Sequence, residues 1–96
     1  MKQYVVIAHD GTDGEALERR MKARPFHLEG ARALKEAGCF VTGGAFLDEN
    51  GSMRGSVMIV QFEGDEEMRK WLANDPYVTQ GVWKSIEVKP FRVAEV

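Results

Sequence analysis

The chain of 96 residues has a single cysteine, Cys39, and so lacks the paired cysteines that are typical of small secreted proteins. One cysteine forms no disulfide within the chain and offers no second thiolate for a zinc site. We therefore expect a protein of the reducing, cytoplasmic compartment. The apolar run before His9 is too short for the core of a signal peptide, and we interpret it as a first strand.

An excess of basic charge is also missing. Thirteen Lys and Arg residues stand against fifteen Asp and Glu residues, which gives a formal net charge of -2. Nucleic-acid binding asks for a basic surface, so the charge gives no case for nucleic acid, nor for a membrane surface. No run approaches the roughly 20 apolar residues of a transmembrane helix. The 44% of hydrophobic residues suit one small domain, residues 1–96, with a single core.

The residue pattern predicts the element order β-α-β-β-α-β. Strands are expected at 4–8, 39–47, 56–62 and 82–91. Residues 15–37 favour a helix interrupted by Pro25, which predicts either a kink or a new helix opening there and ending at Gly38. Asp65 is the expected N-cap of a second helix, which ends near Asn74. This order is typical of the ferredoxin-like α+β fold, with two helices on one face of a four-stranded antiparallel sheet.

Two of the expected strands are apolar at successive positions, in residues 4–8 and 57–60. A sheet with one face in water should instead alternate apolar and polar residues. Two helices cover only one face, so the second face needs a cover of its own. The sequence therefore predicts a homodimer packed sheet to sheet.

The strongest candidates for chemistry are His27 and Asp75. His27 shares a helix face with Ala31 and Leu34, at spacing i, i+4 and i+7. Imidazole exchanges protons near neutral pH, and an aspartate held against it would fix its tautomer and stabilise the charged ring. The alternative for His27 is a core histidine bonded to the sheet. The alternative for Asp75 is a turn cap before Pro76.

The chain resembles the YciI-like (YCII-related) family over nearly its whole length. The motifs that carry the resemblance are Arg24-Pro25-Phe26-His27-Leu28, Leu34-Lys35-Glu36-Ala37-Gly38, Gly43-Gly44, Gly55-Ser56, Asp75-Pro76-Tyr77 and the run 85–91. The resemblance implies a dimeric α/β barrel of ferredoxin-like subunits with a His–Asp pair in a pocket, which matches His27 and Asp75. Among the few members with a known reaction, one is similar to a dehydrochlorinase of a chlorinated hydroxyhydroquinone.

Five further residues are candidate substrate contacts. Arg24 could bind an anionic substrate as a two-pronged donor, or be a solvated charge before the proline. His9 closes the first strand and could face the pocket, or hydrogen-bond within the turn that follows. Ser56 could orient a substrate or fix the start of a strand, and Tyr77 could line the pocket rim. Gly44, in its glycine pair, indicates a bulge or a close approach to a ligand.

The chemistry expected needs no cofactor. No histidines have ligand spacing such as His-x-x-x-His, and the glycines lack the Gly-x-Gly-x-x-Gly spacing of a nucleotide site. We predict a lyase or isomerase in which His27 moves a proton on a small anionic or phenolic substrate. Asp75 would orient the ring, and Arg24 would hold a substrate oxygen. The alternatives are a non-catalytic module that binds a small ligand on the same barrel, and a haem- or oxygen-handling relative of that barrel.

Overall fold

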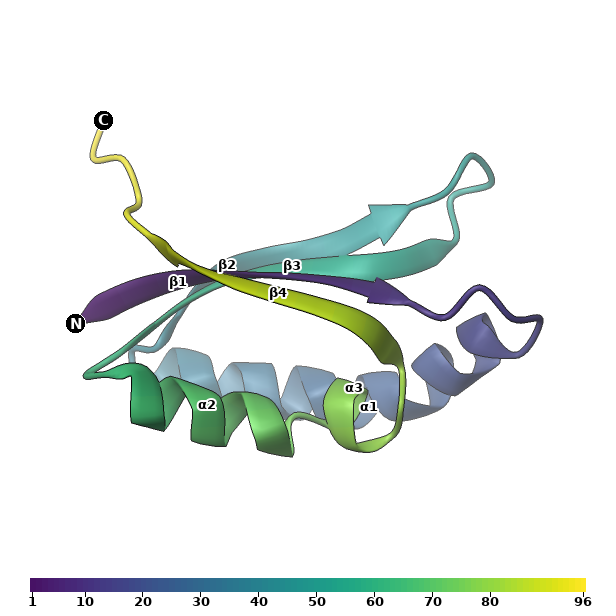
Figure 1. The fold of residues 1–96 in the computed structure, drawn as a ribbon, viewed down its shortest axis with the longest axis horizontal. Helices are drawn as coiled ribbons and strands as arrows, with labels where there is room; N and C mark the ends of the chain where they lie inside the picture. Colours follow the sequence, from purple (N-terminus) through teal and green to yellow (C-terminus); the bar gives the residue numbers. More distant parts are fainter.

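The computed structural model describes residues 1–96 as one sheet covered by helices on one side (Figure 1). The elements are β1 (Lys2–Asp10), α1 (Ala16–Glu36), β2 (Phe40–Leu47), β3 (Met53–Phe62), α2 (Asp65–Asn74), α3 (Pro76–Thr79) and β4 (Trp83–Phe91). The strands pair antiparallel in the order β2-β3-β1-β4. The predicted ferredoxin-like fold is confirmed, with the short α3 as an unpredicted addition. None of the helices combines the length and apolar character that crossing a bilayer requires.

The core lies between the helices and the two central strands. In β1 every second side chain from Tyr4 to Asp10 is buried, and in β3 the same holds from Ser56 to Phe62. Successive strand residues point to opposite faces, so these positions all face the helices. The buried set ends in polar residues, Asp10 on β1 and Ser56 on β3, at neighbouring ends of the two strands. The core is therefore apolar at one end of the sheet and polar at the other.

Helix α1 runs without a break through Pro25, so the interpretation with a new helix opening there is wrong. His27 consequently lies within the helix rather than in its first turn. A proline inside a helix costs roughly 3 kcal/mol because it lacks the N–H and crowds the preceding turn. Packing against the sheet offsets this cost. The buried residues Ala16, Arg20, Ala23 and His27 form one stripe along residues 16–27 of the helix.

Asp65 is the first residue of α2, and Gly64 rather than Asp65 is its N-cap. The Asp65 carboxylate instead accepts hydrogen bonds from the Tyr4 hydroxyl at 2.5 Å and from the Lys2 ammonium at 2.9 Å. Both hydrogen bonds lower the pKa of Asp65, and the bond from Tyr4 has the larger effect. The side chain expected to cap a helix therefore ties that helix to β1.

The second face of the sheet carries no helix (Figure 1). Val5 and Ile7 of β1 lie opposite Ile59 and Val57 of β3, and all four side chains are half-buried. Phe46 of β2 adds an aromatic ring that is 39% exposed. In a single chain, this apolar patch across three strands remains open.

Gly55 of β3 lies at a closely packed position of the sheet, and a substitution there tests that packing. A Cβ there would lie 2.5 Å from the Ala8 carbonyl oxygen and 3.0 Å from the Phe46 ring. Gly55→Ala should therefore lower the free energy of unfolding by about 1–3 kcal/mol in urea titrations. The control is Gly30→Ala in α1, where a Cβ would meet no atom within 4 Å outside its own stretch of helix and alanine should add up to ~1 kcal/mol. Equal effects of the two changes would contradict the close approach at Gly55.

Candidate active site

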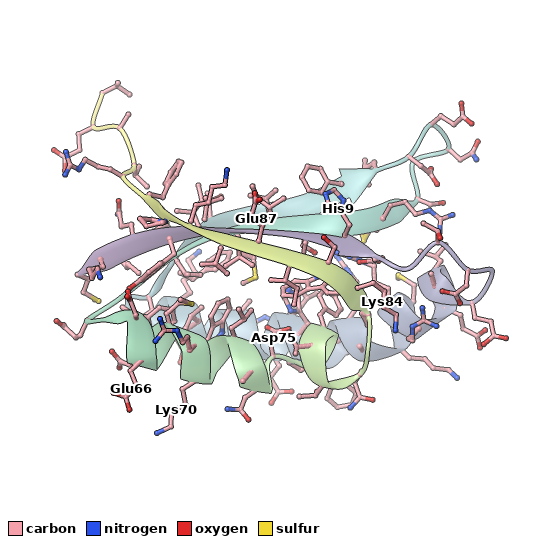
Figure 2. The ribbon with its side chains drawn as sticks, in the orientation of Figure 1. His9, Glu66, Lys70, Asp75, Lys84 and Glu87 are labelled. Carbon is pink, nitrogen blue, oxygen red and sulfur yellow. The ribbon has the colours of Figure 1, made fainter.

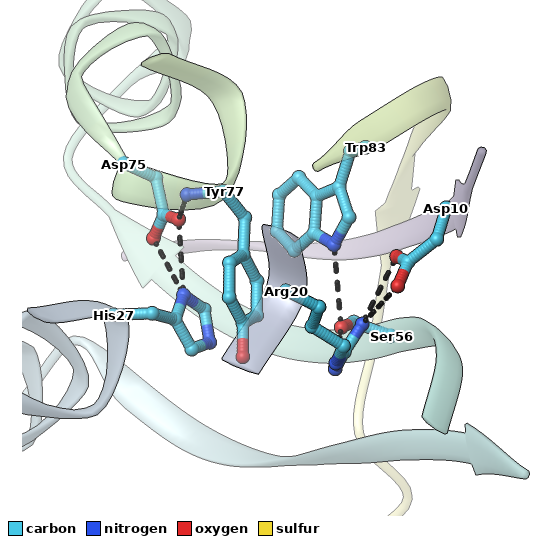
Figure 3. A network of polar contacts seen from close by, with 7 residues as sticks. All are labelled: Asp10, Arg20, His27, Ser56, Asp75, Tyr77 and Trp83. Carbon is cyan, nitrogen blue, oxygen red and sulfur yellow. Dashed lines mark hydrogen bonds and ion pairs between the residues drawn. The ribbon is translucent and has the colours of Figure 1, made fainter. Parts of the chain in front are cut away.

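His27 of α1 and Asp75, which follows α2, meet in the core (Figure 3). The His27 Nδ1 lies 2.9 Å and 3.1 Å from the two carboxylate oxygens of Asp75. The two side chains are 9% and 5% exposed. Because a carboxylate only accepts hydrogen bonds, Nδ1 carries the proton and Nε2 is the basic nitrogen of the neutral ring. This is the arrangement of an oriented general base.

The same carboxylate shapes the chain around it. Asp75 is the N-cap of α3, and its Oδ1 accepts the backbone N–H of Tyr77 at 2.9 Å. Pro76 occupies the first turn, where its missing N–H costs nothing. Asp75 is therefore both a turn cap and the partner of His27, the two alternatives that the sequence left open.

Aromatic rings hold the imidazole in place. The Tyr77 ring stacks on His27 with centroids 3.9 Å apart and planes at 12°, and Trp83 meets His27 edge-on at 5.9 Å. Burial raises the pKa of the Tyr77 phenol, although the positive charges of Arg20 and Arg24 oppose that rise. The phenol therefore stays protonated at neutral pH and can donate a hydrogen bond. Figure 3 shows no polar contact from its hydroxyl to the rest of the network.

A second buried polar centre lies on the other side of the Tyr77 ring (Figure 3). The Arg20 Nη1 donates to both carboxylate oxygens of Asp10, at 3.0 Å and 3.1 Å, and Nη2 donates to the Ser56 hydroxyl at 2.8 Å. The Trp83 indole N–H donates to the same hydroxyl at 3.3 Å. The guanidinium carbon lies 4.6 Å from the Tyr77 ring centre. Two polar centres therefore flank one aromatic ring.

A cavity of about 160 Å³ joins these groups. Its polar lining consists of Arg20, Arg24, His27, Ser56 and Tyr77. Its remaining walls come from apolar side chains of α1, β2 and β3 and from the glycine pair of β2. Ligand pockets are usually roughly 300–1,000 Å³, so this one suits a small molecule.

A larger hollow, of about 560 Å³, lies on the surface beside α1 and α3. Its lining includes Arg19, Lys22 and Phe26, but none of the buried polar side chains described above. This hollow is the larger of the two, whereas the chemistry lies in the smaller cavity. We take the smaller cavity as the candidate site because only there do an oriented base and hydrogen-bond donors converge.

The charges that line the cavity are unequal. Asp10 balances Arg20, and Asp75 lies against His27. Arg24 takes part in none of the ion pairs of the structure. The cavity therefore has one free positive charge, which suits an anionic group. No three side chains of His, Cys, Asp or Glu gather so as to hold a metal ion.

Four of the five predicted substrate contacts line the cavity: Arg24, Gly44, Ser56 and Tyr77. His9 does not line it. Its ring stacks on Phe46 at 5.4 Å, on the open face of the sheet. Figure 2 shows His9 and Asp75 on opposite sides of the sheet. The structure therefore leaves His9 out of the site.

Sequence reasoning missed Arg20 and Asp10. Arg20 lies four residues after Ala16 and seven before His27, which is the spacing of one helix face. Dividing the helix at Pro25 hid that relation. Asp10 continues the alternation of β1, which the predicted strand ended two residues too early.

Comparison with known proteins assigns the family. The family model of the YCII-related domain matches residues 2–92. The chain belongs to the YCII-related domain family. Its relatives in this family include Protein YciI of Escherichia coli O6:H1, 37% identical over 95 residues, with 93% of this chain and 95% of that protein covered. Another relative is the derivative of benzaldehyde biosynthesis cluster protein C of Emericella nidulans, 40% identical over 85 residues, with 81% and 87% covered.

The YCII-related fold is also found in a solved enzyme. The structure is 5-chloro-2-hydroxyhydroquinone dehydrochlorinase (TftG) from Burkholderia phenoliruptrix AC1100, in complex with 2,5-dihydroxybenzoquinone. Its TM-score to this chain is 0.83, and the match covers 96% of this chain and 95% of that one. At 23% identity, the likeness is one of fold. The family and fold expected from the motifs are confirmed.

Asp75→Ala should release the tautomer of His27. The change removes both oxygens that lie near Nδ1, at 2.9 Å and 3.1 Å, so no acceptor fixes the ring proton there. Two-bond ¹H–¹⁵N NMR of the neutral ring should then show both tautomers in exchange, whereas the wild type should carry the proton on Nδ1. Asp13→Ala, at an exposed ion pair with Arg19, is the control, and a neutral ring that keeps its proton on Nδ1 alone in Asp75→Ala would refute the pairing.

Proposed function

We propose that this YCII-related domain is a cofactor-independent enzyme of lyase or isomerase type, which moves a proton on a small anionic or phenolic substrate. The observation that carries the proposal is the His27 ring. Its Nδ1 is held by Asp75, and the ring lines a cavity of about 160 Å³. A base with one nitrogen fixed and the other directed to a substrate is the minimum equipment of general acid–base catalysis.

In the proposed reaction, the His27 Nε2 takes a proton from the substrate, and the electron pair of the broken bond moves into the substrate. In an elimination that electron pair forms a double bond as the leaving group departs as an anion. In an isomerisation the imidazolium returns the proton at another carbon. Asp75 stabilises the imidazolium, and Arg24 binds the anionic oxygen of the substrate. Such proton transfer contributes about 10²–10⁴-fold to rates.

The dehydrochlorinase with the same fold supports the elimination variant. Its name describes the loss of hydrogen chloride from a chlorinated hydroxyhydroquinone, and its bound ligand is an oxygenated six-membered ring. Removal of a proton and departure of chloride are the two halves of such a reaction. A single ring with phenolic oxygens also suits a small cavity with apolar walls and one free cation.

The test is proton exchange and turnover in heavy water, followed by NMR, with chlorinated and unchlorinated hydroquinones and small carbonyl acids. His27→Gln should lower the rate at least about 100-fold. His9→Gln, at the only other histidine, should leave it unchanged because His9 lies outside the cavity. Equal rates in wild type and His27→Gln would contradict the mechanism. Tight binding of a ring compound without exchange or turnover would favour a non-catalytic binding module instead.

The open sheet face supports a second part of this proposal, a homodimer. The half-buried side chains of Val5, Ile7, Val57 and Ile59 form a continuous apolar patch without a cover in the single chain. A twofold axis would lay the patch of one copy on that of the other, which removes both from water. The helices, and with them the candidate cavity, stay on the outer sides of the pair.

Analytical ultracentrifugation should give about twice the mass of the 10.8 kDa chain. Ile59→Glu should produce monomers, because two carboxylates would be buried at the centre of the interface. Met21→Glu is the matched control, since Met21 is a 47% exposed apolar residue on α1. A wild-type species of 10.8 kDa would refute the dimer.

A further inference from the structure

Arg20 has more hydrogen-bond donors than the protein uses. A guanidinium has five N–H groups. Nη1 donates to Asp10 and Nη2 to Ser56, while the buried Nε has no partner. An unpaired buried donor is costly, and a buried ion pair is rarely more stable than apolar side chains of the same size. Stability alone therefore does not account for an arginine at this place in the core.

Asp10 sets the kind of group that Arg20 can bind. The Arg20–Asp10 pair is neutral as a unit, whereas Arg24 lines the same cavity without an ion-pair partner. An anionic oxygen is drawn to the uncompensated charge of Arg24. The remaining N–H groups of Arg20 suit an uncharged oxygen, a carbonyl or a phenol, which is not repelled by the nearby carboxylate.

Tyr77 separates Arg20 from the general base. Its ring stacks on His27 on one side, at 3.9 Å, and lies 4.6 Å from the Arg20 guanidinium carbon on the other. In Figure 3 the free imidazole nitrogen, the phenol hydroxyl and the guanidinium point in the same direction. A ligand lying along this row meets His27 at one end and Arg20 at the other.

The volume of the cavity limits what can lie there. A cavity of about 150 Å³ in an apolar core holds one benzene ring, and the cavity here is about 160 Å³. Phe40, Leu28 and Met58 give it apolar walls. One six-membered ring with small substituents therefore fits within the cavity.

We propose that Arg20 is the specificity-determining residue of this site and binds a second, uncharged oxygen of the substrate. The substrates are then single-ring compounds with oxygens at opposite ends, one at His27 and Arg24 and the other at Arg20. This inference rests on the proposed function for the role of His27. It adds the position and the charge state of the second polar group.

The first test compares two ligands of equal size, 1,4-dihydroxybenzene and 4-methylphenol, by calorimetry in oxygen-free buffer. The wild type should bind the dihydroxy compound about five- to tenfold more tightly. Burying a second hydroxyl without a partner is unfavourable, so a cavity lacking such a site would prefer the methyl compound. Equal affinities, the reverse preference or binding of neither compound would overturn the inference.

The second test removes the arginine. Arg20→Met should abolish the preference while 4-methylphenol still binds, which shows that the cavity is intact. Because this change leaves Asp10 unpaired and buried, the double variant Arg20→Met with Asp10→Val removes both charges and should behave in the same way. A folded variant that keeps the wild-type preference would overturn the role of Arg20.

The result for the role of Arg20 in binding can be distinguished from the result for the proposed enzymatic function. His27→Gln should retain the preference for 1,4-dihydroxybenzene, since Arg20 and its partners are unchanged. If the preference exists but no compound undergoes proton transfer, the proposed enzyme fails and the binding specificity stands. If turnover depends on His27 while Arg20→Met leaves the preference intact, the enzyme stands and the role of Arg20 fails.

Discussion

The Asp75 carboxylate is the group on which the rest of the site depends. It caps α3 through the Tyr77 N–H and holds the imidazole of His27 on α1. These contacts join the end of the α2–α3 segment to the middle of α1 across the core. The cap fixes where the Tyr77 ring lies, and that ring in turn stacks on His27. One anionic side chain therefore sets the tautomer, the position and the packing of the candidate base.

Helix α1 carries the two polar centres because it continues through Pro25. Arg20 and His27 lie on the same stripe, seven residues apart, and therefore face the same cavity. If the helix ended before Pro25, Arg20 and His27 would lie on separate segments, and their relative orientation would not be fixed by one helix. The cost of an internal proline is met by burial of this stripe against β1 and β3, so the packing of the core and the geometry of the site have the same origin.

The two faces of the sheet have separate roles. The closed face carries the buried polar residues, and the open face carries an apolar patch together with His9. His9 and Asp10 are neighbours in sequence, yet successive strand residues point to opposite faces. Asp10 therefore belongs to the site, and His9 to the surface that the proposed dimer would bury. The solved dehydrochlorinase, which shares this fold over nearly the whole chain, holds 2,5-dihydroxybenzoquinone, a small oxygenated ring.

Much of the fold could be predicted from the sequence because strands and helices differ in period and end at recognisable residues. The element order, Gly38 after α1 and the glycine-containing hairpin before β3 all follow from such local signals. The predicted boundaries were wrong where contacts between distant segments set the end of an element. Strand β3 begins at Met53, three residues before its predicted start, and Asp65 binds Tyr4 instead of capping α2. A hydrogen bond to a distant strand cannot be inferred from neighbouring residues.

The sequence by itself determined the fold class, the inward position of His27 on α1, and its pairing with Asp75, which the motifs suggested. Only the tertiary structure decided that Arg20 is buried, that Asp10 is its partner and that His9 faces away from the cavity. The physical reason is that a charged side chain in a helix is normally solvated. Its burial depends on a carboxylate and a hydroxyl from two other strands, Asp10 and Ser56, which folding alone brings to the guanidinium.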